Sequence, residues 1–335
     1  MKKRTKIFII ILSVLLAVVL ALGSAYMVLF YLGKSQFHKD DTNISVDSAE
    51  IIDDETVSIN GKNYIRNENI ITVLFMGMDK ADVNTPRGYG TNGQADCIFL
   101  AAIDTSKREL TIIPISRETM VDVNVYTTEG AFGGTRQLQL CLAYAYGNSP
   151  QESSGNVMTS VRRLLYGINV SSYLTVDMKG IGVFSEMLDG IELDSIEDII
   201  IEGNAVKTGQ RLKLSGKSAF DYIHYRGDDI EANYRRMQRQ KQFLTAMANK
   251  SGNMIMQNFS RLGSFYNDMS PYFNTNITLS QIAYLVSSCI TLNMGDAMEY
   301  KIIDGTLNMG EEWVEFYPDE VSLLNVVLET FYIEK

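Results

Sequence analysis

The chain begins with one long apolar run and continues with apolar segments that alternate with polar ones. Residues 7–33 contain no charged side chain, and about 20 apolar residues are enough to cross the hydrocarbon core of a bilayer. Four cations precede the run, namely Lys2, Lys3, Arg4 and Lys6. Lys34 is the only cation close to its other end. Because basic residues stay on the cytoplasmic side, this asymmetry predicts a cytoplasmic N-terminus and an exported remainder.

A cleaved signal peptide is the alternative interpretation of this run. Residues 23–25 supply the small side chains that a signal peptidase needs, but the apolar run continues through residues 27–30. We therefore favour an uncleaved anchor. Residues 1–34 then form a cytoplasmic basic tip and a single transmembrane helix, and residues 35–54 form a polar stalk. Residues 55–335 form one extracellular domain of a cell-membrane protein.

Short apolar runs in that domain predict the strands of a buried sheet. Asn60 and Gly61 separate two alternating runs, which is a strong signal for a β-hairpin. Buried strands are expected at residues 70–76, 97–103 and 110–115. The segment between the first two, residues 80–96, is polar and rich in glycine. Because long loops in compact domains are usually functional or disordered, and this one joins two core strands, we expect it to be functional.

The rest of the domain shows helical and strand-like patterns in alternation. The spacing of apolar positions predicts helices at residues 136–147, 155–166, 181–188, 215–222, 230–250 and 319–331. Strand-like runs occur at residues 173–178, 190–194, 300–303 and 313–317. This alternation predicts an α/β fold with a central mixed β-sheet that is flanked by helices on both faces.

The net charge and the numbers of cysteines and histidines limit the kinds of function that the domain can have. After residue 34 the chain carries 25 cations and 40 acids, a net charge of −15, which argues against a general nucleic-acid binder. Cys97, Cys141 and Cys289 lie in apolar runs without metal-binding spacing, so we expect buried free thiols. With only two histidines, His38 and His224, a Ser-His-Asp triad or a multi-histidine metal site is nearly excluded.

Two aspartates lie at the ends of predicted core strands. Asp79 follows the first strand, and Asp96 immediately precedes the second. If these strands are neighbours, both carboxylates reach one rim of the sheet, where oxygen ligands suit Mg²⁺ or Mn²⁺. An aspartate beside a strand is also a common turn former, so the pair alone does not identify a metal site.

Arginines gather at three places that the predicted fold can bring together. Arg117 follows the third core strand, Arg226 ends the YIHYR segment, and a third group begins the long helix at Arg235, Arg236, Arg239 and Lys241. Arg236, Arg239 and Gln240 are spaced to share one helical face. A solvated basic patch is the alternative, but a local gathering of guanidinium groups in so acidic a domain favours an anion site. Metal-binding carboxylates with convergent arginines suit phosphoryl transfer from a pyrophosphate.

These residues resemble the motifs of the LytR-CpsA-Psr family of cell-wall glycopolymer ligases. The resemblance extends from about residue 71 to residue 250. It rests on seven ordered motifs: LFMGMD (74–79), QADCIFLAAID (94–104), PISRETM (114–120), LAYAYG (142–147), DGIEL (189–193), KTGQRLKLSGKSAFDYIHYR (207–226) and RRMQRQ (235–240). A single N-terminal membrane helix before an external domain also matches the layout of that family.

The resemblance implies an enzyme that attaches a secondary wall polymer to peptidoglycan. The polymer is a teichoic acid or a capsular or other polysaccharide, and it comes from a polyprenyl-pyrophosphate carrier. Mg²⁺ is implied near Asp79 and Asp96, with these two residues and Arg117 as the catalytic set. The pyrophosphate is implied to contact Arg117, Arg226, Arg236 and Arg239, with Gln240 nearby. An apolar pocket between sheet and helices is implied for the lipid tail.

Three residues depart from the family pattern. Gln94 and His224 stand where the family has arginines, and Glu118 stands where it has an aspartate. The loss of two cations weakens the anion site unless Arg87 or Arg235 compensates. His224 can still donate a hydrogen bond to phosphate.

Three functional readings follow. The leading hypothesis is a Mg²⁺-dependent phosphotransferase. In the second, water is the nucleophile in the same site, and the protein hydrolyses the polyprenyl pyrophosphate. In the third, the protein binds the lipid-linked polymer without catalysis and acts in envelope assembly or regulation. Gln94 and His224 favour this third reading.

Overall fold

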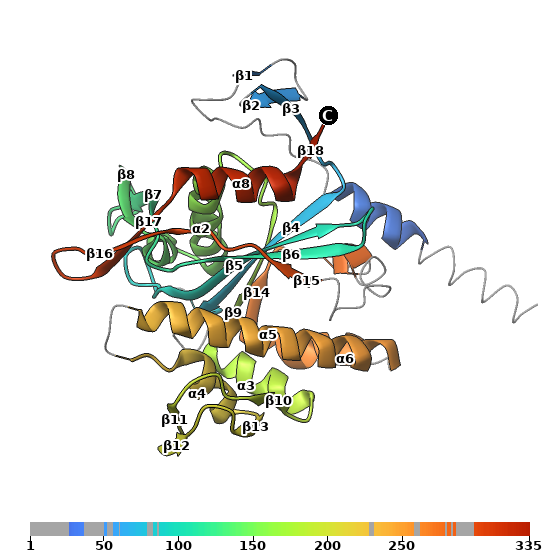
Figure 1. The fold of residues 1–335 in the computed structure, drawn as a ribbon, viewed down its shortest axis with the longest axis vertical. Helices are drawn as coiled ribbons and strands as arrows, with labels where there is room; N and C mark the ends of the chain where they lie inside the picture. The colour runs from blue at the N-terminus through green and yellow to red at the C-terminus, as the bar shows by residue number, and fades with distance from the viewer. Residues whose placement is uncertain are drawn as a thin grey trace, which may run out of the picture.

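The centre of the protein is a six-stranded mixed β-sheet in the order β14-β9-β4-β5-β6-β15 (Figure 1). The computed structural model describes residues 27–36, 50–51, 56–59, 61–78, 83–85, 87–227, 231–257, 262–278, 280–282, 284–285 and 298–335. The sheet strands are β4 (Ile70–Met78), β5 (Ala95–Asp104), β6 (Glu109–Ile115), β9 (Ser172–Val176), β14 (Phe273–Thr275) and β15 (Met298–Tyr300). β5 is antiparallel to β4 and β6, whereas β9 is parallel to β4. The three core strands expected from the sequence are confirmed.

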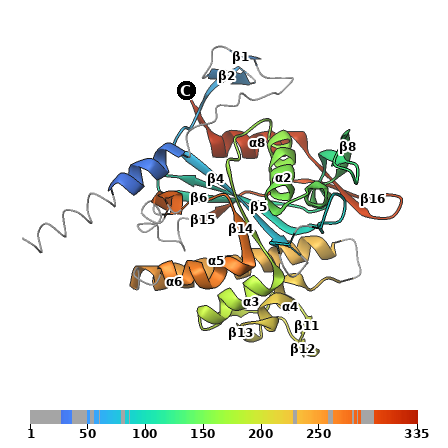
Figure 2. The ribbon, with the colours of Figure 1, turned by 180° about the vertical axis from the view of Figure 1, so that it is seen from behind.

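Helices cover both faces of this sheet, as predicted (Figures 1 and 2). One face carries α2 (Pro150–Leu164) and α8 (Glu320–Phe331). On that side Leu74 and Leu100 of the sheet belong to one buried cluster with Val157 of α2 and Val327 of α8. The other face lies toward α5 (Ala232–Gln257) and α6 (Leu262–Met269). Burial of these apolar faces is the main source of stability for such a layered domain.

A smaller cluster lies beside α5. It contains α3 (Met178–Met187), α4 (Lys217–His224), and the strand pairs β10 (Ile191–Asp194) with β13 (Arg211–Leu214) and β11 (Ile199–Ile201) with β12 (Asn204–Val206). The strand predicted at residues 190–194 forms, as β10, but it does not join the central sheet beside β9. Instead β10 pairs with β13, because Ile191 and Leu193 bury their side chains against α4 and α5 rather than against the main sheet.

The helix predicted at residues 136–147 is wrong over its first part. β8 (Phe132–Gln139) pairs with β7 (Met120–Tyr126), and a 3₁₀ helix, η1 (Leu140–Tyr146), follows. The apolar spacing of this short segment fits both structures, and the backbone hydrogen bonds to β7 decide between them.

The remaining elements lie at the periphery. The β-hairpin around Gly61 is confirmed, and its strands form a small sheet with the two chain segments that flank them. This sheet contains β1 (Glu50–Ile51), β2 (Thr56–Ile59), β3 (Lys62–Arg66) and β18 (Tyr332–Glu334). β1 therefore belongs to the folded domain, although we assigned its residues to the stalk. A second β-hairpin joins β16 (Gly305–Met309) to β17 (Val314–Pro318), and η3 (Ser270–Tyr272) precedes β14.

Residues 27–36 form a helix. In the part of the chain that the structure describes, no helix is both long and apolar enough to cross a bilayer. Most of the predicted transmembrane segment, residues 7–26, lies outside the described residues.

Candidate functional site

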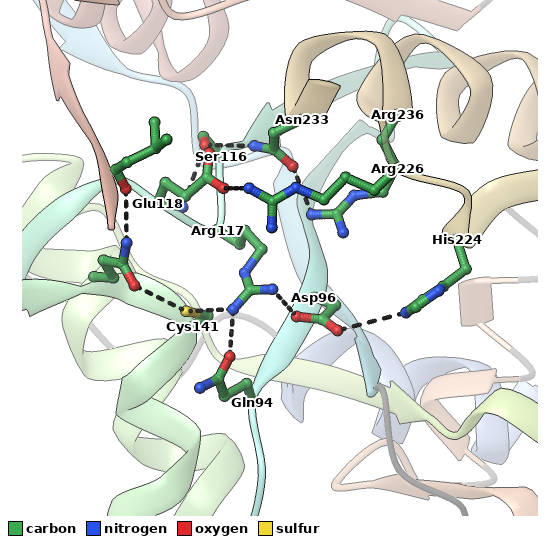
Figure 3. Close-up of polar contacts among 12 residues, drawn as sticks. Gln94, Asp96, Ser116, Arg117, Glu118, Cys141, His224, Arg226, Asn233 and Arg236 are labelled. Atoms are coloured by element: carbon green, nitrogen blue, oxygen red, sulfur yellow. Dashed lines mark hydrogen bonds and ion pairs between the residues drawn. The ribbon is translucent and has the colours of Figure 1, made fainter. Parts of the chain in front are cut away.

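The ends of β5 and β6 bring Asp96 and Arg117 together (Figure 3). The two strands are antiparallel, with Ile98 opposite Ile115, so the start of β5 lies beside the end of β6. Nη1 of Arg117 is 2.6 Å from Oδ1 of Asp96. The Arg117 side chain is 15% exposed and that of Asp96 is 10% exposed. The pair is therefore largely shielded from water but still reachable from the rim, and charge-assisted contacts are strong in that environment.

Two of the departures from the family pattern contact this pair. Oε1 of Gln94 accepts a hydrogen bond from Nη2 of Arg117. His224 is the last residue of α4, and its Nε2 lies 3.9 Å from Oδ2 of Asp96. The imidazole stacks on Phe220 with ring centroids 4.7 Å apart. Gln94 thus fixes the orientation of Arg117, and His224 presents a ring nitrogen on the opposite side of Asp96.

Arg226 and Glu118 form a second ion pair close to Arg117. Nη2 of Arg226 donates to Oε1 of Glu118 over 3.3 Å. Burial raises the pKa of Glu118, and the nearby Arg226, Arg117 and Arg236 oppose that shift without cancelling it. Burial therefore destabilises the charged form of Glu118 by more than the three arginines stabilise it.

Arg236 is the most unusual cation of the group. It is 3% exposed, and its Nη2 donates to Oδ1 of Asn233 over 2.5 Å. Asn233 in turn donates to Oγ of Ser116 over 3.0 Å. Among the described residues, no carboxylate forms a salt bridge with Arg236, and its Nε lacks a hydrogen-bond partner. Burial lowers the pKa of this guanidinium, and Asp96 opposes that shift. A buried cation in this state favours the arrival of an anion.

The expected convergence of distant arginines is confirmed for three of them. Arg117, Arg226 and Arg236 come from different elements and lie together with Asp96 (Figure 3), and Arg117 and Asp96 line one small hollow. Three guanidinium groups meet two carboxylates, those of Asp96 and Glu118, in this described part of the site. The hollow is therefore positive within a domain that is negative as a whole. Asp79 directly follows β4 and lies outside the described residues.

The surroundings of the Arg239 side chain do not fit the prediction that it contacts pyrophosphate. Its side chain is 1% exposed and forms an ion pair with Glu197. Nε donates to the carbonyl oxygen of Tyr222 over 2.8 Å, and Nη2 donates to that of Tyr225. Burial lowers its pKa to about 10. Arg235, which we considered as a substitute cation, also pairs with Glu197, at 3.2 Å. Arg235 and Arg239 thus connect α5 to the segments around Glu197 and Tyr222.

Gln240 and Arg87 line two different hollows. Gln240 lines the same hollow as Asp96 and Arg117, and its Nε2 donates to the carbonyl oxygen of Ile223 over 3.3 Å. Arg87 belongs to the Gly-rich loop and lines a separate small hollow with Tyr144. The structure thus places Gln240, but not Arg87, beside Asp96 and Arg117.

Sequence reasoning missed three residues that hold the arginines in place. Ser116 and Asn233 connect Arg236 to the end of β6, and Nη2 of Arg117 lies 3.3 Å from Sγ of Cys141. Burial raises the pKa of the Cys141 thiol. The position of Asn233 three residues before Arg236 on a helix was the available signal.

Cys97 and Cys141, which we expected to be buried free thiols, differ in how far they are buried. Cys97 is only half-buried, although burial raises the pKa of its thiol to about 12. Cys141 is buried, and neither thiol forms a disulfide. Cys289 lies outside the described residues.

The donor set at the rim is compatible with a divalent cation. The described residues contain no group of three metal-ligating side chains. Mg²⁺ in phosphate-transferring enzymes nevertheless needs only one or two carboxylates, because water and substrate phosphates complete its shell. Asp96 supplies one carboxylate to the hollow that it lines with Arg117. The chemistry of this residue therefore fits Mg²⁺ or Mn²⁺, with Asp79 as the second expected ligand.

An apolar floor extends from the cluster across the sheet. The strand registers align Leu174 of β9, Phe75 of β4, Phe99 of β5 and Pro114 of β6 in one row. All four are only partly buried, although their strands are central in the sheet. The rings of Phe75 and Phe99 stack with centroids 4.8 Å apart. Such incompletely covered apolar side chains indicate a place for an apolar ligand.

Two hollows are lined by residues of α5 and by Pro114 of this floor. The smaller one contains Asp96, Phe99, Pro114 and, from α5, Met237 and Leu244. A cavity of about 270 Å³ adjoins it and shares several of its walls. The shared residues are Pro114, Ile115, Asn233, Met237 and Lys241. An apolar volume thus begins directly beside the charged cluster.

Comparison with known proteins decides the family. The model of the LytR_cpsA_psr family matches residues 29–325. The chain belongs to this family. The match covers both the strands and the helices that build the arginine cluster.

One relative and two solved structures show similarity to this protein along most of its chain. A relative from Enterococcus faecalis, polyisoprenyl-teichoic acid–peptidoglycan teichoic acid transferase TagU, is 25% identical over 252 residues, which are 75% of this chain and 73% of that protein. The crystal structure of TagV from B. subtilis has a TM-score of 0.61 at 21% identity and covers 79% of this chain and 98% of that one. The structure of TagT bound to LIIa-WTA has a TM-score of 0.59 at 19% identity, with 78% and 89% covered. These structures confirm the mixed α/β fold.

Proposed function

We propose that this protein is a phosphotransferase that attaches a secondary wall glycopolymer to peptidoglycan, using a polyprenyl-pyrophosphate-linked polymer as donor. The observation that carries the proposal is the buried guanidinium of Arg236, which forms no salt bridge with any carboxylate of the described residues and lies beside Arg117 and Arg226. A pyrophosphate supplies the negative charge that this hollow lacks, and guanidinium groups bind phosphate oxygens in pairs. The name of the E. faecalis relative, a teichoic acid transferase, supports the same substrate class.

The apolar floor supports a lipid-linked donor over a soluble one. Phe75 and Phe99 continue the site away from Asp96 without any charged side chain in their row. A polyprenyl tail placed on this floor would bury apolar surface, at about 25 cal/mol per Å². The tail and the pyrophosphate would then be bound by adjoining parts of one site, and remote binding energy of this kind positions the reacting group.

The proposed reaction is one displacement at phosphorus. A sugar hydroxyl of the peptidoglycan attacks the phosphorus that carries the polymer, and a new oxygen–phosphorus bond forms. The bond from that phosphorus to the oxygen bridging the two phosphates breaks, and polyprenyl phosphate leaves with the bonding electron pair. The hydroxyl proton is released. Arg117, Arg226 and Arg236 stabilise the charge that develops on the leaving phosphate.

Several side chains keep this arrangement in place. Asp96 and Gln94 orient Arg117, Glu118 orients Arg226, and the Asn233 amide orients Arg236. Mg²⁺ or Mn²⁺, bound by Asp96 and Asp79, would neutralise further charge on the phosphate oxygens. His224 is 40% exposed, which leaves its ring able to donate a hydrogen bond to the substrate.

We further propose the membrane topology that the sequence predicts. The protein is a single-pass cell-membrane protein with a cytoplasmic N-terminus, and its α/β domain lies outside the cell, where peptidoglycan is found. The apolar run of residues 7–33 and the cations before it support this topology.

A transfer assay with purified full-length protein tests the function. The donor is a polyprenyl-pyrophosphate glycan in vesicles with Mg²⁺, and the acceptor is nascent peptidoglycan. The proposal predicts covalent polymer–peptidoglycan product. Release of free phosphorylated polymer without acceptor would instead indicate the hydrolase. Donor binding without either product would indicate the non-catalytic binding protein, which the replacement of two arginines by Gln94 and His224 favours.

A further inference from the structure

A short helix at residues 27–36 packs directly against the domain. Phe30 and Gly33 are its only residues that are not exposed. The ring of Phe30 meets that of Tyr284 edge to face, with centroids 4.9 Å apart. A Cβ on Gly33 would collide with the carbonyl oxygen of Ser280, so only glycine permits this approach. One narrow face of the helix is therefore fitted to the segment around residue 280.

The polar end of the same helix is also attached to the domain. Oε1 of Gln36 accepts hydrogen bonds from Oγ1 of Thr278 over 2.8 Å and from Oγ of Ser280 over 3.1 Å. Apolar and polar contacts thus follow one another along the helix. This order matches a helix that passes from an apolar medium into water.

The other apolar side chains of this helix are exposed in the structure of the described residues. More than 40% of each of five side chains is exposed, and these are Met27, Val28, Leu29, Tyr31 and Leu32. They continue the charge-free run that starts at residue 7, and the run ends where Lys34, Ser35 and Gln36 begin. Such a surface is unfavourable in water and favourable in a bilayer. The occupant that fits it is therefore lipid, with the water boundary near Gly33.

The docking contact lies at one end of the central sheet. Phe30 and Tyr284 form a cluster with Ile71 of β4 and Ile103 of β5. The arginine cluster lies beyond the other end of the same strands, where Asp96 and Gly77 are found. Six residue steps separate Ile71 from Gly77, which is about 20 Å along a strand.

We propose that helix 27–36 acts as a bracket: it is held rigidly against the domain and does not link it flexibly to the membrane. The helix thereby seats the Tyr284–Leu285 end of the domain on the outer surface of the bilayer. The arginine cluster then stands up to about 20 Å above the lipid, along strands whose apolar floor can receive a polyprenyl tail. This inference rests on the proposed function for its substrate, but the seating itself can be measured without any substrate.

Tryptophan fluorescence gives the direct test, because the chain contains one tryptophan. Trp313 is 70% exposed and precedes β17 in the turn of the β16–β17 hairpin. This hairpin lies on the opposite side of the domain from helix 27–36 in both views (Figures 1 and 2). Full-length protein is reconstituted into vesicles that contain brominated phosphatidylcholine. We expect no quenching of Trp313, and loss of fluorescence in Trp313→Phe variants that carry Tyr284→Trp or Leu285→Trp. Emission from both new tryptophans as unquenched as that of Trp313 would overturn the seating.

Gly33→Leu removes the seating in an otherwise intact chain, and Ser35→Leu adds the same bulk on an exposed position of the helix as control. Gly33→Leu should restore the fluorescence of the protein that carries Tyr284→Trp. It should also reduce transfer from a vesicle-embedded donor about tenfold, because a loosely held domain meets the lipid less often. Transfer from a short-chain, water-soluble donor should not change. Equal transfer by both variants from vesicles would contradict the bracket. No transfer by wild type from either donor would contradict the proposed function and leave the quenching result standing.

Discussion

Glu118 and Arg226 form an ion pair between side chains that are 108 residues apart in the chain, with 3.3 Å between Oε1 and Nη2. The pair joins the end of β6 to the segment after α4 and so closes one side of the arginine cluster. The carboxylate is 4% exposed and the guanidinium is 43% exposed. The acid is thus the fixed partner, and the arginine is the one that can reach a ligand.

The buried acid makes stability depend on pH in a defined direction. Burial raises the pKa of Glu118 in the folded protein above its ordinary value of 4.5. The folded state therefore favours the protonated form of Glu118. The stability that this preference contributes is fully present below the unfolded pKa and is lost as the pH rises through the folded pKa. We expect Glu118→Gln to have a higher free energy of unfolding than wild type at pH 7.5, and the difference to vanish as the pH falls below the ordinary value of 4.5. Urea unfolding at both pH values measures it, and a difference of opposite sign would show that the arginines dominate.

Replacement of Arg236 should separate stability from ligand binding. Arg236→Met removes a buried charge that lacks a carboxylate among the described residues, so the unfolding free energy should stay constant or rise by about 1 kcal/mol. Inorganic pyrophosphate should raise the melting temperature of wild type but not that of the variant. Equal thermal shifts in both proteins would place the anion elsewhere.

Arg239 is the matched control three residues along the same helix. Its guanidinium is committed to Glu197 and to two carbonyl oxygens. Arg239→Met should therefore lower the unfolding free energy by about 3 kcal/mol, because Glu197 loses its buried partner. Transfer per folded molecule should remain within a few-fold of wild type. A loss of pyrophosphate binding in this variant, with stability intact, would restore Arg239 to the anion site.

Restoring the two missing arginines of the family should have unequal effects. Gln94→Arg replaces the acceptor of Arg117 with a second cation, so transfer should fall. His224→Arg places a longer cation beside Asp96 from a position that is 40% exposed. Its KM for the lipid-linked donor should fall about fivefold, which corresponds to one added charge-assisted contact. Steady-state kinetics of the two single variants test this, and equal gains from both would mean that Gln94 does not hold Arg117.

The sequence predicted the sheet better than the helices around it. Ile70–Met78 and Ala95–Asp104 each contain a long, mostly apolar run, and this pattern does not depend on distant partners. The segment that contains Phe132–Gln139 has a spacing that fits a helix as well, and its pairing with β7 is a tertiary fact. Local patterns cannot distinguish such cases because the deciding hydrogen bonds come from elsewhere in the chain.

The site shows the same limit at the level of single residues. Arg117 and Arg226 were predictable because they end elements that the fold brings together. Arg236 and Arg239 looked equivalent on one helix, yet Arg236 lies beside Asp96 and Arg117, and Arg239 is paired with Glu197. Residue type and spacing give the charge, but the carbonyl oxygens and carboxylates that surround each guanidinium decide its role.

The most direct test of the proposed function is transfer by Arg117→Ala and Asp96→Ala. Each variant is assayed with the lipid-linked donor, Mg²⁺ and nascent peptidoglycan, and covalent product is counted per folded protein. Wild type should form product, and each variant should be slower by about 100-fold or more, as expected when a group that stabilises developing charge is removed. Product formation at the wild-type rate by both variants would contradict a phosphotransferase centred on this pair.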